Sequence, residues 1–159
     1  MPSFRKACEL PIPEWFLVFR AAFWFVIVEV GMRILRFTTL TKMLSNRKLP
    51  QKARGSQSCG AERVAYCVEL ASRFDPLQAT CLKKALVLYA LLIRRGLDVR
   101  LFIGAAKTKT DLANCIDYHA WLEHQGRVIL GGGKGERYIP LYCVCGSDDE
   151  ACGQRQVIT

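Results

Sequence analysis

"TCLKKALVLYALLIRRGLDVRLFIG", residues 80–104, is the stretch that decides the fold. Its first part repeats apolar residues over a wide helical face, with Thr80 as a capping residue and two arginines and Gly96 as a normal ending. An earlier start is also open, because Asp75 can cap a helix whose first turn holds a proline. After Gly96 the pattern changes, and residues 98–104 predict a β-strand.

On either side of this stretch, the sequence predicts helices before it and strands after it. The expected helices cover residues 14–36, the short run "TTLTKML" and the run "AERVAYCVELASRF", in which apolar residues recur at helical spacing. A tight turn at Gln125-Gly126 joins the middle two of the four expected strands, which are 98–104, 117–123, 127–131 and 138–144. The sequence therefore predicts an α+β fold, in which a mostly antiparallel sheet packs on the helix of Cys81.

With 159 residues, the chain has about the length of one ordinary domain. The polar and basic run "SNRKLPQKARGSQSCG" is its one convincing linker. We expect four regions: an N-terminal helical region 1–45, a basic linker 46–60, the main domain 61–145 and a tail 146–159.

Positive charge is concentrated around the linker. The formal net charge is +9, and residues 33–60 hold seven Lys or Arg and no acid. Such a run is either a solvated face or the contact surface for an acidic partner, such as a peptide, anionic lipid or nucleic acid. Because no aromatic residues interleave these charges and no known reader motif is present, we do not expect nucleic acid to be the partner.

The most hydrophobic segment is "WFLVFRAAFWFVIVEVGMRILRF", residues 15–37. A membrane-spanning helix needs roughly 20 nearly uncharged residues, and Arg20, Glu29 and Arg33 interrupt this segment. We therefore expect a helix that is buried against the rest of the protein. The alternative is a helix that lies on an anionic membrane surface with the basic run beside it.

Eight cysteines would form a disulfide framework in a secreted protein, but no secretory signal with a cleavage site precedes them. We therefore expect a cytoplasmic protein with mostly free, buried thiols. A zinc site at Cys143, Cys145 and Cys152 would lack the second cysteine pair or Cys/His pair that completes a tetrahedral set. We expect neither a metal nor a cofactor.

Cys81 stands at or near the start of the strong helix, where unpaired backbone amides and the helix dipole favour an anion. Such a position favours the thiolate, which is the reactive form of cysteine, and the same amides can hold the oxyanion of an acyl intermediate. Lys83 and Lys84 add positive charge nearby. The alternative is that Cys81 is one more buried cysteine.

His119 lies on an expected strand and shares a face with Trp121 and Glu123, because side chains alternate along a strand. A histidine can orient a thiol and take its proton, as Cys-dependent acyl transfer requires. The alternative is a structural histidine. His124 falls at the turn, where we expect it to be exposed, so His119 is the candidate base.

A third group usually fixes the tautomer of such a histidine. The turn at 125–126 predicts that residue 124 pairs with 127, 121 with 130 and 119 with 132, so an acid is expected near 131 or 132. The sequence has three glycines there, residues 131–133, and "GGGKGE" has neither the spacing nor the hydroxyl of a phosphate-binding loop. The substitutes are Asp117, on the same face, and Glu136, if the glycines let the chain fold back.

The run "CLKKALVLYALLIRRGLDVRLFIGA", followed by "YHAWLEHQGRVI" and "YIPL", resembles the transglutaminase-like leader peptidases of lasso-peptide biosynthesis, of the McjB C-terminal type. The resemblance covers residues 61–142 and extends more weakly to 14–44, where Arg36 replaces a proline often found before the phenylalanine. It implies a papain/transglutaminase-like fold. It also implies a cysteine peptidase that cuts the leader from a ribosomally made precursor peptide, so that a cyclase can close the lasso ring.

Carried over to this sequence, the resemblance makes Cys81 the nucleophile and His119 the general base. The third residue of the family, an aspartate, falls in the glycine run here. The implied partners are the leader region of the precursor peptide, a separate leader-binding protein of the RRE type, and an asparagine-synthetase-like lasso cyclase that uses ATP. Two alternatives stay open: a non-catalytic transglutaminase-like module that binds a peptide or scaffolds a complex, and a different acyl transfer on the same scaffold.

Overall fold

The structure is a computed structural model of the chain, and it describes residues 12–45, 58–75, 78–110, 113–132 and 138–145. Helices come first and strands follow, so the predicted α+β fold is confirmed. The helical elements are α1 (Ile12–Ile34), α2 (Phe37–Ser45), α3 (Ser58–Ala71), the 3-10 turn η2 (Ser72–Phe74) and α4 (Cys81–Ile93). The strands are β1 (Val99–Thr110), β2 (Ala113–His124), β3 (Arg127–Leu130) and β4 (Ile139–Cys145).

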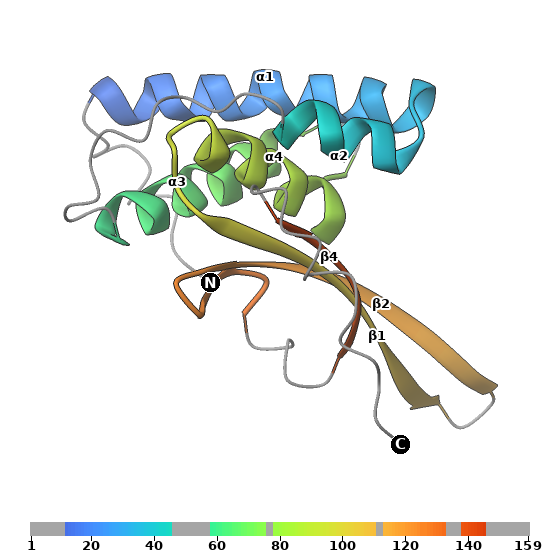
Figure 1. Cartoon of the computed structure of the whole chain (residues 1–159). Coiled ribbons are helices and arrows are strands. Elements are labelled where there is room, and N and C mark those ends of the chain that lie inside the picture. The colour runs from blue at the N-terminus through green and yellow to red at the C-terminus, as the bar shows by residue number, and fades with distance from the viewer. Residues whose placement is uncertain (1–11, 46–57, 76–77, 111–112, 133–137, 146–159) are drawn as a thin grey trace.

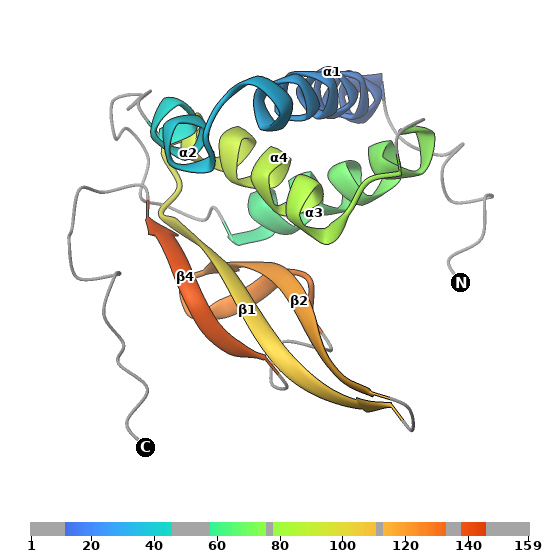
Figure 2. The same ribbon diagram turned by 90° about the vertical axis from the view of Figure 1, so that its right-hand side faces the viewer.

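The strands form one antiparallel sheet in the order β3-β2-β1-β4. Figure 2 shows three layers, with α1 and α2 on the outside, α3 and α4 in the middle and the sheet below them. The β1–β2 ribbon is the longest pair, and its far end extends beyond the helices (Figure 1). Because α4 contacts both the outer helices and the sheet, it is the central element of the fold.

α4 is central because apolar residues surround it on nearly every side. All of residues 85–93 are buried, and burying one large apolar side chain stabilises a fold by roughly 1.5–3 kcal/mol. Thr80 is the N-cap, and its side chain accepts a hydrogen bond from the backbone N–H of Lys83 at 3.3 Å. The predicted cap is therefore confirmed. A start at Asp75 is wrong, because Asp75 follows η2 and the helix begins at Cys81.

One apolar core joins the amino-terminal helices to the rest of the fold. Val28 of α1 and Leu40 of α2 are buried in the same cluster as Leu86 of α4 and Leu101 of β1. Gly31 of α1 lies directly against α2, since a Cβ at this glycine would be 2.7 Å from Leu40 Cδ1. Helices from both sides of the predicted linker thus share one interior.

β1 and β2 are longer than the sequence predicts. The strand expected at 98–104 continues to Thr110, and the strand expected at 117–123 begins at Ala113. The added segments carry no apolar alternation, yet the ribbon pairs without interruption from Lys107 with Ile116 to Thr110 with Ala113. Backbone hydrogen bonds therefore extend a ribbon where the side-chain pattern gives no signal.

The turn at Gln125-Gly126 is confirmed, because its residues have the positive φ angles, 51° and 76°, that a two-residue hairpin turn requires. Residue 124 pairs with 127 as predicted. The predicted pairing of 121 with 130 is wrong, because Leu122 pairs with Leu130. A bulge between Leu122 and Glu123 shifts the register by one residue.

Candidate active site

Cys81 is the first residue of α4, where the backbone N–H groups of the first turn have no partner within the helix. Its side chain is a free thiol that packs, half-buried, against the apolar core. This location at a helix start is the one that the sequence predicts. The helix dipole stabilises negative charge at such an amino terminus.

The two lysines that follow Cys81 are both paired. Lys83 is buried and forms an ion pair with Glu29 of α1, and its hydrogen bond lowers the pKa of Glu29 below the ordinary value of 4.5. Lys84 forms an ion pair with Glu69 of α3, with 3.0 Å between Nζ and Oε2. Each of the two lysines predicted to add positive charge near the thiol is thus paired with a carboxylate.

His119 is half-buried in β2 and lies beside two aromatic rings. Its ring centroid is 5.0 Å from that of Tyr138 and 6.4 Å from that of Trp121. Trp121 stacks on Phe102 with 5.5 Å between centroids, and its Nε1 donates a hydrogen bond to Glu123 Oε1 at 3.1 Å. These contacts confirm the predicted common face of residues 119, 121 and 123.

A backbone carbonyl lies where the third catalytic group is expected. His119 Nε2 is 3.1 Å from the carbonyl oxygen of Gly131. Because a carbonyl oxygen only accepts hydrogen bonds, Nε2 carries the proton, and the neutral ring has its lone pair at Nδ1. An imidazole held in this tautomer can take a proton from a thiol at Nδ1.

Gly131 can make this contact because it has no side chain. Its φ is +79°, and a Cβ would lie 2.9 Å from the carbonyl oxygen of Ala120 and 3.1 Å from His119 Nε2. The glycine run that removes the expected acid therefore also lets the main chain approach the imidazole.

Asp117 is connected to His119 through a tyrosine. Tyr138 Oη donates a hydrogen bond to Asp117 Oδ2 at 2.6 Å, while the Tyr138 ring packs on the imidazole at an angle of 36°. In the described residues, Asp117 thus holds Tyr138 instead of contacting the imidazole directly. The other substitute acid, Glu136, lies outside the described residues.

The structure brings the elements of Cys81 and His119 together without joining their side chains. α4 packs on β1 and β2, and Ala120 and Leu122 of β2 belong to the shared core. Since side chains alternate along a strand, His119 lies on the opposite face from Ala120. Over the part of the chain that the structure describes, no hydrogen bond joins the Cys81 thiol to His119.

His124 is buried, so its predicted exposure is wrong. The tight turn places it on the core face of β2, where it pairs with Val99. Its Nδ1 donates to the carbonyl oxygen of Asp98 at 2.7 Å. His124 is therefore a structural histidine of the sheet, and His119 remains the candidate base.

Among the described residues, no group of three His, Cys, Asp or Glu side chains could hold a metal ion. Cys143 is disulfide-bonded, and its sulfur is 3.7 Å from that of Cys145. Cys152, the third residue of the zinc site considered from the sequence, lies outside the described residues. Cys81 is a free thiol.

Two parts of this arrangement have only weak signals in the sequence. Tyr138 opens an expected strand, but nothing in its type or spacing points to His119. The Gly131 carbonyl belongs to the backbone, and the only hint of it is a glycine at the position of an expected acid.

A comparison with protein families now adds to this geometry. A family model described as the transglutaminase-like superfamily matches residues 23–143. No curated protein and no solved structure matches the chain. The family match runs from the second half of α1 through α4 and the sheet to residue 143 in β4, and it covers more than half of the chain. The chain therefore belongs to the transglutaminase-like superfamily.

Proposed function

We propose that this member of the transglutaminase-like superfamily is a cysteine peptidase that removes the leader from a ribosomally made lasso-peptide precursor in the cytoplasm. The superfamily includes cysteine proteases. The observation that carries the proposal is a free thiol, Cys81, at the amino terminus of α4, together with His119 held at Nε2 by a carbonyl.

The proposed reaction uses the tautomer of His119 directly. Nδ1 takes the proton of the Cys81 thiol, and the thiolate attacks the scissile carbonyl carbon while the amides of the first turn of α4 stabilise the oxyanion. The imidazolium returns its proton to the leaving amine as the peptide C–N bond breaks. Water then attacks the thioester, which releases the carboxylic acid and restores the thiol.

The thiol and Nδ1 must come into hydrogen-bond contact for this step. Catalytic hydrogen bonds are often long or poorly aligned before substrate binds, and they tighten in the complex. Because His119 lies on the opposite face of β2 from Ala120, which packs in the core with α4, the proposed reaction also requires that binding of the precursor brings the imidazole and the thiol to the same side of the sheet.

The proposed partners follow from the resemblance of residues 61–142 to leader peptidases. They are the leader region of the precursor, a separate leader-binding protein of the RRE type that presents it, and an asparagine-synthetase-like cyclase. The cyclase would use the amine that the cleavage exposes. These partners are proposed from the sequence resemblance, and the geometry around His119 does not bear on them.

The direct test is a cleavage assay with the precursor and the leader-binding protein, in which mass spectrometry identifies the products. Cys81→Ala is expected to lower the cleavage rate by at least about 1,000-fold, because the nucleophile is lost. Cys145→Ala, which removes another half-buried cysteine, is expected to keep the activity. Equal cleavage by the Cys81→Ala protein would rule out the proposal.

A second candidate function is a module that binds a peptide or scaffolds a biosynthetic complex without cutting it. The observation that favours it is that Cys81 and His119 share no hydrogen bond over the described residues. This alternative expects peptide binding with an unchanged precursor mass in the same assay. A different acyl transfer, such as amide cross-linking or deamidation, would give a product mass that neither of the other functions produces.

A further inference from the structure

α1 carries apolar side chains on two opposite faces. The inner face is buried against α3 and α4 through Val18, Ala21, Phe25 and Val28. On the outer face, apolar residues recur at steps of three and four, which is the spacing of one helical stripe. The members of this outer stripe have exposed fractions between 48% and 71%: Phe16, Phe19, Phe23, Val26 and Val30.

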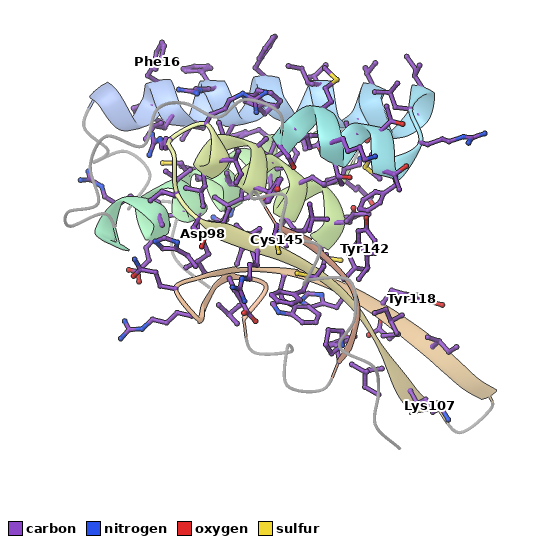
Figure 3. All side chains as sticks on the ribbon, in the orientation of Figure 1. Phe16, Asp98, Lys107, Tyr118, Tyr142 and Cys145 are labelled. Carbon is purple, nitrogen blue, oxygen red and sulfur yellow. The ribbon has the colours of Figure 1, made fainter. Side chains whose placement is uncertain are left out.

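The outer stripe points away from the rest of the molecule. Figure 3 shows the side chains of α1, with Phe16 among them, projecting from the surface opposite the middle helices and the sheet. An ordinary surface helix would carry polar residues on this face. Three exposed phenylalanines in one row form instead the kind of apolar patch that marks an interaction site.

The charge around the stripe is positive. Arg33 near the end of α1, Arg36 between the two helices and Lys42 on α2 are exposed. Glu29, an acid of α1, is ion-paired with both Lys83 and Arg33. The apolar stripe therefore ends at a cationic region. This combination is complementary to a lipid bilayer, which has an apolar interior and can carry anionic headgroups.

α1 is long and apolar enough, by length and composition, to cross a bilayer over Trp15–Ile34. If α1 crossed a bilayer, its inner face would leave the shared core, and Glu29 would be separated from the buried Lys83. A position in the plane of the membrane keeps these contacts and buries only the outer stripe.

We propose that the outer stripe of α1 binds the surface of an anionic lipid bilayer, with α1 lying in the membrane plane. The phenylalanines enter the boundary between headgroups and acyl chains, and the basic region contacts the anionic headgroups. This binding does not depend on the proposed peptidase activity, because neither Cys81 nor His119 takes part in it.

The test is co-sedimentation of the full chain with vesicles. We expect the protein to bind vesicles of equal parts phosphatidylcholine and phosphatidylglycerol, to bind phosphatidylcholine alone much more weakly, and to be released by salt. Phe23→Glu is expected to weaken binding by at least about tenfold, because a charge replaces a large apolar side chain that would enter the bilayer. Ile116→Glu is the matched control, since Ile116 is also exposed but lies on β2, and it is expected to bind like the wild type.

A second variant tests the electrostatic part. Arg36→Glu combined with Lys42→Glu is expected to lower binding to the anionic vesicles while leaving the urea midpoint of unfolding unchanged, because both side chains are exposed. Failure of the wild type to bind anionic vesicles at low salt would overturn the proposal. So would self-association without lipid that Phe23→Glu abolishes, because a second copy of the chain would then cover the stripe.

Discussion

Gly131 contacts His119 through its backbone carbonyl, and the absence of a side chain at this position makes the close approach possible. Its carbonyl oxygen accepts from Nε2 and thereby leaves Nδ1 as the basic nitrogen of the imidazole. A neutral acceptor fixes the tautomer without adding a negative charge beside the ring. The acid expected at this position is then unnecessary for orientation, although it would have stabilised the imidazolium more strongly.

Gly131→Ala is predicted to damage both the site and the fold. A Cβ would meet Ala120 O and Trp121 Cβ at 2.9 Å, and φ would stay in the left-handed region. We expect the free energy of unfolding to fall by about 1–3 kcal/mol and precursor cleavage to slow by at least about tenfold. Urea unfolding and the cleavage assay measure these two effects.

Gly132→Ala is the control for this prediction. A Cβ at Gly132 would meet only Val128 Cγ1, at 3.8 Å, which is ordinary contact. The Gly132→Ala protein should therefore match the wild type in stability and cleavage. If Gly131→Ala and Gly132→Ala had the same stability and the same cleavage rate, the close approach of Gly131 to the imidazole would have no functional role.

The sequence predicts Cys81 and His119 as candidate residues, but it does not predict the contacts that hold the His119 ring. Cys81 stands out as a helix start, and His119 stands out in a strand with alternating aromatic and acidic neighbours. The roles of Gly131 and Tyr138 depend on a carbonyl and on a ring contact between separate strands. No residue type or spacing encodes such contacts, and the bulge near Leu122 moved the predicted partner by one position.

At the scale of elements, the pair of Glu29 and Lys83 attaches α1 to the start of α4, two residues after Cys81. Lys83 is buried, and an ammonium in such a place requires a charged or hydrogen-bonding partner. The pair therefore fixes the amino-terminal turn of α4 against the outer helix layer. The position of the Cys81 thiol therefore depends on α1, a helix that contains no candidate catalytic residue.

Glu29→Gln is predicted to destabilise the fold at pH 7 and to reduce its sensitivity to acid. The Lys83 hydrogen bond lowers the pKa of Glu29 in the folded state, so the carboxylate contributes stability above its unfolded pKa. That contribution is lost as the pH falls through the folded pKa. Urea unfolding between pH 7 and pH 3 should show a smaller loss of stability in the Glu29→Gln protein than in the wild type.

Glu69→Gln supplies the comparison, because Glu69 pairs with the neighbouring Lys84 in an exposed ion pair. Its removal should change the free energy of unfolding by less than about 1 kcal/mol. Equal effects of the two substitutions would show that the pair at Lys83 behaves as an ordinary surface contact.

The elements differ in how well the sequence predicts them. α4 was predictable with its cap, because local propensity, apolar spacing and tertiary burial all agree there. The sequence predicts too short a ribbon for β1 and β2, because residues such as Lys107 pair across the ribbon where the apolar pattern gives no strand signal. His124 was misplaced for a related reason: proximity to a turn does not determine which face of the strand a side chain occupies.

At the scale of the whole molecule, the amino-terminal helices are part of the same fold as the sheet. Phe25 and Val28 of α1 and Leu44 of α2 are buried in one cluster with α4 and β1. The family match begins at residue 23, inside α1, which agrees with this packing. The helices on either side of the predicted linker therefore contribute to one core.

A fragment of residues 58–159 is predicted not to fold cooperatively. Without α1 and α2, the outer surfaces of α3 and α4 would expose large apolar side chains to water. Urea unfolding followed by circular dichroism should show a broad transition, and sedimentation should show aggregates. A fragment of residues 12–159 should unfold like the full chain. A sharp transition for the 58–159 fragment would mean that the folded domain begins at α3 and does not need α1 and α2.

The proposed reaction requires that Cys81 is a nucleophile activated by its helix terminus and by His119. The most direct measurement is the rate of alkylation of each free thiol by iodoacetamide at about pH 6, read by peptide mass spectrometry in the presence of the precursor and the leader-binding protein. The account predicts that Cys81 reacts at least about tenfold faster than Cys145, and that His119→Ala removes this difference. Equal rates at Cys81 and Cys145 in the wild type would contradict it.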